Sequence, residues 1–313
     1  MEKLRKLYEE YLNRFTHIKD LNKQKEIGDI LETLHKKVDR GNLYFYDLLY
    51  SSYSYEEYCM QGSDKVEKDF RVIMHNNYNE LMNGFSYLLD IPKKEHFNRK
   101  TLLDDEDEII STFFLSLDKD LYELYNRLKP MTFRVFEDGT GQTSYDSEKD
   151  RTMVFAGREH TVESMIALVH ELGHAYYVDT FKETRNAYDC YDMLKREIPS
   201  ETLELLFIKY LIDNDLYSED AINRLNEFNN TMLNDATKFY ENKMFLNEND
   251  HGQIRDMKYL LGSIMSYDFL NNNISFRDLL YYVHNSDVSS IIKNIDYKTV
   301  SENINKSYCL KKQ

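Results

Sequence analysis

Apolar residues recur every three or four positions along most of this chain, the spacing that places them on one face of an α-helix. Breaks in the pattern come at Gly, Pro and clusters of polar residues. The pattern predicts helices over residues 1–18, 20–39, 43–60, 64–89, 104–128, 165–175, 199–212, 218–246, 253–272, 275–285 and 287–307. We therefore expect a mainly α protein.

Two short segments depart from the helical pattern. Met131–Phe136 alternates between apolar and polar residues over most of its length. Thr152–Ala156 is an apolar run that ends at Gly157. Both are typical of β-strands. Asp138–Gly141 is predicted as a turn, because no Lys-Ser/Thr pair follows its glycines as in a phosphate-binding loop.

The second predicted strand precedes the helix at 165–175, and this order suggests a use for it. An extended peptide can pair with the free edge of such a strand. The candidate substrate edge consists of Val154, Phe155, Ala156 and Gly157. The alternative is a small hairpin that only covers the helix.

The chain length of 313 residues allows one large domain or two lobes around a cleft. Few helix breakers occur, with only 3 Pro and 10 Gly, which agrees with a mostly helical fold. The polar segment Asp90–Lys100, which carries Pro92, is the candidate lobe boundary, and a simple connection between helices is the alternative. The expected division is an N-terminal helical lobe, 1–100, and a second lobe, 101–313, which contains the two strand segments and the helix at 165–175.

Charge and cysteine content limit the possible partners. The net charge of −15 argues against a nucleic-acid partner, because phosphate binding needs clustered Lys and Arg. Three cysteines, far apart and without a C-x-x-C pair, suggest a reducing compartment. The N-terminal residues have no apolar signal core, and no apolar run is long enough to span a membrane. We expect a cytoplasmic protein without a membrane partner, and a monomer.

The helix at 165–175 contains His170, Glu171 and His174 in the pattern H-E-x-x-H. Residues four apart lie on one helix face, so both imidazoles can reach one ion. Zinc binds neutral imidazole nitrogens, and a neighbouring carboxylate can take a proton from water at its open position. The alternative is a chance match in a buried helix, which would leave costly polar groups without partners.

Two histidines leave zinc short of a third protein ligand. An H-x-x-G-x-x-H continuation is excluded, because Tyr177 and Thr180 occupy the Gly and His positions. Carboxylates spaced i, i+4, i+7 on a later helix are the strongest candidates: one could bind zinc and another could fix the tautomer of a ligand His. These are Glu197, Glu201 and Glu204. A solvated acidic surface is the alternative, and the competing ligands are Asp179, Glu183, Asp189 and Asp192.

Two segments resemble the thimet oligopeptidase and oligoendopeptidase F family of zinc peptidases. Met153–His174 is similar to the family's edge strand and His-Glu-Leu-Gly-His helix, and Glu197–Glu204 is similar to its Glu-x-Pro-Ser block. The resemblance implies one zinc ion per chain, held by His170, His174 and Glu197, with Glu171 as general base. It also implies that Glu204 contacts a ligand His.

A third block, His251–Tyr267, has a weaker resemblance to the same family. The family places a His and several Tyr there, which contact substrate and stabilise the oxyanion. This makes Tyr259 the candidate donor and His251 a further candidate, whereas Arg255 and Met257 depart from the pattern. The alternative for Tyr259 is a core or surface residue, since the chain has 26 Tyr.

The sequence thus predicts a multi-helical, zincin-like metallopeptidase with a small β element and a substrate cleft between helical lobes. The predicted function is zinc-dependent hydrolysis of peptide bonds in oligopeptides by an endopeptidase. Resemblance covers residues 150–270, and the chain is shorter than typical members. One alternative is an exopeptidase of the same chemistry. Another is a non-catalytic peptide-binding helical protein with a structural zinc.

Overall fold

The computed structural model describes residues 68–97, 100–136, 141–146, 151–157, 159–182, 190–242, 251–272 and 274–308. The helices predicted over 1–18, 20–39 and 43–60 lie outside these residues. The described chain forms two compact units, of which the first contains 103–182 and the second contains 68–102 and 190–308. The chain passes between units at 102/103 and again at 184/185. The division into lobes 1–100 and 101–313 stays a prediction.

The first unit combines helices with a small sheet. Its elements are α6 (Glu106–Leu117), α7 (Lys119–Leu128), the 3-10 turn η1 (Lys129–Met131), β1 (Thr132–Phe136), β2 (Gln142–Asp146), β3 (Arg151–Gly157) and α8 (Val162–Phe181). The helix predicted over 104–128 is divided at Asp118, whose backbone is extended with φ −167° and ψ 142°. The Asp118 side chain accepts a hydrogen bond from the backbone N–H of Asp120 and so caps α7.

The strand order in this sheet is β1-β3-β2, with β3 parallel to β1 and antiparallel to β2. The expectation that Val154, Phe155, Ala156 and Gly157 form a free edge is wrong, because β3 is the middle strand. Val154 pairs with both Thr132 and Thr143. The residues Met153 to Ala156 are all buried, as in a strand covered on both faces, and this explains their uninterrupted apolar run. β2 was not predicted because its sequence, Gln-Thr-Ser-Tyr-Asp, is mostly polar.

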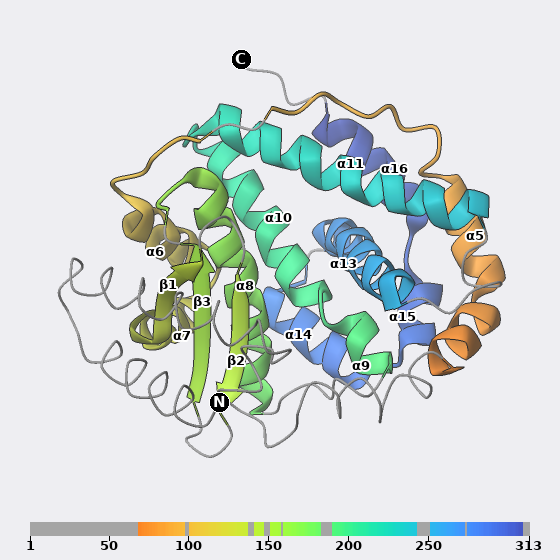
Figure 1. Ribbon diagram of the computed structural model, residues 1–313, viewed down its shortest axis with the longest axis horizontal. Coiled ribbons are helices and arrows are strands. Elements are labelled where there is room, and N and C mark those ends of the chain that lie inside the picture. The colour runs from red at the N-terminus through yellow and green to blue at the C-terminus, as the bar shows by residue number, and fades with distance from the viewer. Residues whose placement is uncertain are drawn as a thin grey trace, which may run out of the picture. The chain divides into compact units, whose positions relative to one another are not determined.

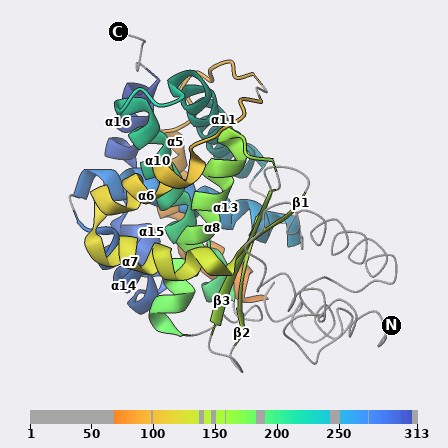
Figure 2. The ribbon, with the colours of Figure 1, turned by 90° about the vertical axis from the view of Figure 1, so that its left-hand side faces the viewer.

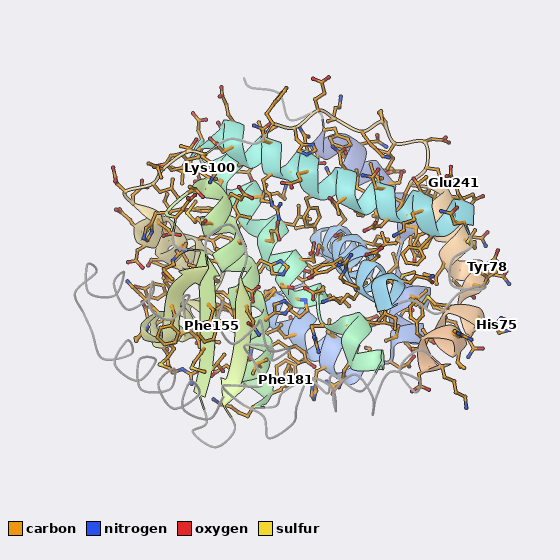
Figure 3. The ribbon with its side chains drawn as sticks, viewed as in Figure 1. His75, Tyr78, Lys100, Phe155, Phe181 and Glu241 are labelled. Atoms are coloured by element: carbon orange, nitrogen blue, oxygen red, sulfur yellow. The ribbon has the colours of Figure 1, made fainter. Side chains whose placement is uncertain are left out.

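Helix α8 packs against β3 and β2. Figure 2 shows α8 on one face of the sheet, with α6 and α7 on the same side. The Thr161 side chain caps α8 by accepting from the N–H of Ser164. The Tyr176 hydroxyl donates to the carbonyl oxygen of Leu121 at 2.6 Å, which ties α8 to α7. The ring centroid of Phe155, labelled on β3 in Figure 3, lies 5.5 Å from that of Phe133, its partner on β1, and both residues are buried.

The second unit is helical. Residues 68–76 form a helix, followed by α5 (Tyr78–Ser86), α9 (Cys190–Lys195), α10 (Ile198–Asp213), α11 (Ser218–Asn242), α13 (His251–Asn272), α14 (Phe276–Asn285), α15 (Val288–Asn294) and α16 (Tyr297–Ser307). Figure 1 shows α13 running among the other helices of this unit, and it packs against α9, α10, α11 and α16. Every residue from Leu260 to Phe269 is buried, because neighbouring helices surround this part of α13.

Two predicted helices of this unit are divided by polar residues. The helix predicted over 64–89 is interrupted at Asn77, whose side-chain amide donates to the carbonyl of Ile73 at 2.7 Å. The helix predicted over 287–307 becomes α15 and α16, because Asp296 accepts from the N–H of Thr299 and starts a new helix. The mainly α fold with a small sheet is confirmed by the described residues. No helix among them is both long and apolar enough to cross a membrane.

Candidate metal centre

Helix α8 brings His170, Glu171 and His174 together. The two imidazole rings have centroids 5.1 Å apart and planes inclined by 79°. One ligand atom from each of the three residues lies within 4.8 Å of the others. Both histidines are partly exposed, whereas Glu171 is 8% exposed. This donor set fits zinc, which binds imidazole nitrogens and keeps a position open where it acts in catalysis.

Strand β2 contacts the carboxylate of Glu171. The Thr143 hydroxyl donates to the Glu171 carbonyl oxygen at 2.7 Å and lies 3.0 Å from Oε2 of the same residue. Gly141, just before β2, faces the Glu171 side chain so closely that a Cβ there would overlap with Cγ and lie 3.0 Å from Cδ and Oε1. The sequence did not indicate either residue as part of the site. The only related feature predicted from the sequence was the turn at Asp138–Gly141, which includes Gly141.

The three candidate carboxylates, which all belong to the second unit, are buried. Glu197 occupies the N-cap position of α10, without a capping hydrogen bond from its side chain. It is 2% exposed, with Glu201 at 7% and Glu204 at 2%. Pro199 lies in the first turn of α10, where a missing backbone N–H costs no helical hydrogen bond. The alternative of a solvated acidic surface is therefore wrong, and each buried carboxylate needs hydrogen-bonding or charged partners.

Helices α13 and α11 supply those partners. Nζ of Lys258 lies 2.6 Å from Oε1 of Glu197, and the Ser263 hydroxyl donates to Glu201 at 3.0 Å. On α11, Arg224 contacts Oε1 of Glu204 through two nitrogens, at 3.0 and 2.8 Å. Glu197 and Glu204 are thus paired with cations from two neighbouring helices, whereas Glu201 accepts a hydrogen bond from a neutral hydroxyl.

Gly262 of α13 lets α10 approach closely at this face. A Cβ on Gly262 would lie 2.8 Å from Cγ of Glu201 and 3.0 Å from Cβ of Glu197. A larger residue would therefore push the acidic side chains away from α13. The resemblance singled out the sequence around Gly262 but not this role.

The remaining candidates are placed as follows. Tyr259 of α13 is 36% exposed, and Lys258 Nζ lies 4.5 Å from its ring centroid. His251 is the first residue of α13, and its side chain lies outside the described part of the structure. Their catalytic roles stay predictions.

Of the competing ligands, Asp179 has a structural role in α8. It pairs with Arg127 at 2.5 Å and with Lys182 at 3.1 Å. These bonds connect α8 to α7 and to the residue that ends α8. Glu183 and Asp189 lie outside the described residues.

Comparisons with known proteins give only distant likenesses. No protein-family model and no curated protein matches the chain. A structure from Bacillus anthracis str. Ames, assigned as an oligoendopeptidase F, has a TM-score of 0.48 and 15% identity over 90% of this chain and 62% of that chain. PZ peptidase A with inhibitor 2 has a TM-score of 0.44 and 14% identity over 96% of this chain and 66% of that chain. This chain spans less than two thirds of the length of either protein. Because the identities and TM-scores are low, its function must be inferred from its own residues.

Proposed function

We propose that this chain hydrolyses peptide bonds in short peptides with the help of one zinc ion. The observation that carries the proposal is the grouping of His170, Glu171 and His174 on one face of α8, with their ligand atoms within 4.8 Å of one another. A structural zinc site needs no extra carboxylate of this kind. Glu171 therefore favours a hydrolase over a peptide-binding protein with a structural metal.

The zinc would be held by His170 and His174, with Glu197 as the third ligand. The Glu-x-Pro-Ser block supports Glu197, and its burial in the second unit agrees with a carboxylate kept for a cation. When bound, zinc polarises a substrate carbonyl and acidifies water, so that water can attack near neutral pH. Glu204, which Arg224 holds through two contacts, is the candidate to orient a ligand His. Glu201 is the alternative for that role.

Glu171 acts as the general base and then as the general acid. Its carboxylate accepts a proton from the attacking water while the carbon–oxygen bond forms. It then donates this proton to the leaving amine as the carbon–nitrogen bond breaks. Glu171 is only 8% exposed, so few bulk water molecules can form hydrogen bonds with its carboxylate.

The substrate would lie along β2, which replaces β3 as the candidate strand for pairing. β2 is at one edge of the described sheet, runs antiparallel to β3 and contacts Glu171 through Thr143. A peptide that pairs with β2 would therefore pass beside the base. Tyr259, which is 36% exposed, is the candidate to donate a hydrogen bond to the oxyanion, with His251 as a further candidate.

The substitution Glu171→Gln tests this proposal. We expect the variant to retain zinc but to lose cleavage of fluorogenic peptides by at least about 100-fold, since general base catalysis contributes that much. Glu163→Gln is the matched control, because Glu163 lies exposed in the first turn of the same helix and should leave cleavage unchanged. Unchanged turnover in Glu171→Gln would contradict the mechanism.

A second measurement separates an endopeptidase from an exopeptidase. A peptide of about ten residues, blocked at both ends, is incubated with the zinc-loaded protein, and the product masses are measured. An endopeptidase cuts within such a peptide, as we propose, whereas an exopeptidase leaves it intact. Intact peptide together with cleavage of unblocked peptides would favour the exopeptidase.

A further inference from the structure

We infer that Gly141 and Thr143 position the Glu171 carboxylate for proton transfer, an inference that rests on the proposed function. The two residues are separated by one position, so they present the same side of the extended chain. Both contact Glu171. Gly141 lets the backbone before β2 come close to the Glu171 side chain, whereas the Thr143 hydroxyl contacts a carboxylate oxygen.

Gly141 is required by close approach and not by backbone conformation. Among the described glycines none has a positive φ, so the Gly141 backbone would accept any residue. A Cβ at this position would overlap with Cγ of Glu171. Because Cγ lies next to the Cβ of Glu171, Gly141→Ala requires this side chain to change its χ1 angle or the backbone at Gly141 to shift, and either change displaces the carboxylate. Gly141 therefore keeps open the space that this side chain occupies.

Thr143 contacts the same side chain through its hydroxyl. Its hydroxyl has one proton, which the Glu171 carbonyl oxygen at 2.7 Å and Oε2 at 3.0 Å share. The backbone of Thr143 pairs with Val154 in the middle strand of the sheet, which fixes where the hydroxyl stands. A hydrogen bond from a rigid strand thus restricts the rotation of the carboxylate about its own side-chain bonds.

This restriction matters for proton transfer. A base acts only within hydrogen-bond reach of the proton it takes, and a misplacement of about 1 Å can cost about 100-fold in rate. Thr143 and Gly141 act on the reaction only through Glu171, so they are positioning residues. Their loss should lower kcat and leave KM and zinc content unchanged.

Four variants test the inference in the zinc-loaded protein. Thr143→Val keeps the side-chain shape and removes the hydroxyl, so we expect kcat to fall about 10- to 100-fold. Thr143→Ser restores the hydroxyl and should recover most of that loss. Gly141→Ala should lower kcat at least as much as Thr143→Val. Thr132→Val is the matched control on β1, where the hydroxyl donates only to the Leu128 carbonyl at 3.3 Å among its described contacts, and it should leave kcat unchanged.

A further readout does not depend on activity. The urea unfolding midpoints of the zinc-free protein are compared for Thr143→Val, Glu171→Ala and the double variant. If the hydroxyl contacts the carboxylate, the two single shifts should add up to more than the shift of the double variant. Strictly additive shifts would overturn the inference.

The outcomes separate this inference from the proposed function. An active wild type whose kcat is unchanged by Thr143→Val, or is not recovered by Thr143→Ser, overturns the positioning role and leaves the hydrolase proposal intact. A zinc-loaded wild type that cleaves no peptide overturns both. A kcat loss that Ser rescues, with KM and zinc content unchanged, supports the inference.

Discussion

Lys258 and Glu197 form a buried ion pair between α13 and the start of α10. Nζ lies 2.6 Å from Oε1, and the two side chains are 14% and 2% exposed. Removing one partner of such a pair leaves a buried charge without compensation, which costs more than the pair itself contributes. Because Glu197 is also the proposed third zinc ligand, this ion pair connects the stability of the second unit with metal binding.

We expect Lys258→Met to destabilise the zinc-free protein by about 3 kcal/mol. Zinc would then replace the positive charge that Lys258 provides beside Glu197 in the wild type. The rise in Tm on adding zinc should therefore be larger in the variant than in the wild type. Differential scanning fluorimetry with and without zinc measures both effects. The matched control is Lys119→Met, whose pair with Glu123 at 3.5 Å is exposed and should matter little. Equal zinc-induced shifts in Lys258→Met and wild type would contradict Glu197 as a ligand.

A second prediction concerns Glu106, which ties α6 to β1 and to the residue before the α8 cap. The Glu106 carboxylate pairs with Arg134 and with Nδ1 of His160, and Arg134 also donates to the carbonyl oxygen of Gly157 at 3.0 Å. Burial alone would raise the pKa of Glu106. The hydrogen bond with His160 and the charge of Arg134 outweigh burial and hold its pKa below the usual value. This ionised carboxylate therefore stabilises the folded state.

We expect Glu106→Gln to destabilise the protein at pH 7. A lowered folded-state pKa contributes stability that is present above the unfolded-state value and is lost as the pH falls through the folded-state value. The deficit of the variant should therefore shrink as the pH falls below the ordinary value of 4.5. Urea unfolding at pH 7 and at lower pH measures it, with the exposed Glu108→Gln on the same helix as control. A deficit that does not change with pH would argue against the ionised pair.

Asp235 of α11 provides a prediction with the opposite sign. Burial and the nearby charge of Asp256 raise the pKa of Asp235 to about 6. The folded state therefore binds a proton more tightly than the unfolded state, and stability falls as the pH rises from the ordinary value of 3.8 to about 6.

Asp235→Asn removes this unfavourable charge. We expect the variant to have a higher Tm than the wild type above about pH 6 and the same Tm below the ordinary pKa of 3.8. Thermal scans across this pH range measure the difference, and the exposed Asp90→Asn should show no comparable gain. A lower Tm for Asp235→Asn at pH 7 would be the contrary result.

The sequence predicts what depends on local spacing. Helix α10 was expected at 199–212 and runs from Ile198 to Asp213, because Pro199 and the apolar face define it locally. The H-E-x-x-H triad likewise lies within one helical turn, so its grouping follows from helix geometry. Single polar residues that divide a helix, such as Asp118, were missed because a cap leaves the apolar spacing on both sides unchanged.

Other parts of the site depend on contacts between distant segments. β2 has no apolar alternation, and it is a strand only because β3 provides its partner. Gly141 and Thr143 precede Glu171 by about thirty residues, and Lys258 follows Glu197 by about sixty. No local pattern connects such pairs. The place of β3 in the sheet was also predicted wrongly. A buried apolar run identifies a strand but does not tell whether one or two strands flank it.

The most direct test of the central claim is a crystal structure of the zinc-loaded protein with anomalous data collected at the zinc edge. The account predicts one zinc peak per chain, at about 2.0–2.2 Å from a nitrogen of His170, a nitrogen of His174 and a carboxylate oxygen of Glu197. A protein that holds no zinc after metal loading, or a peak away from His170 and His174, would contradict the account.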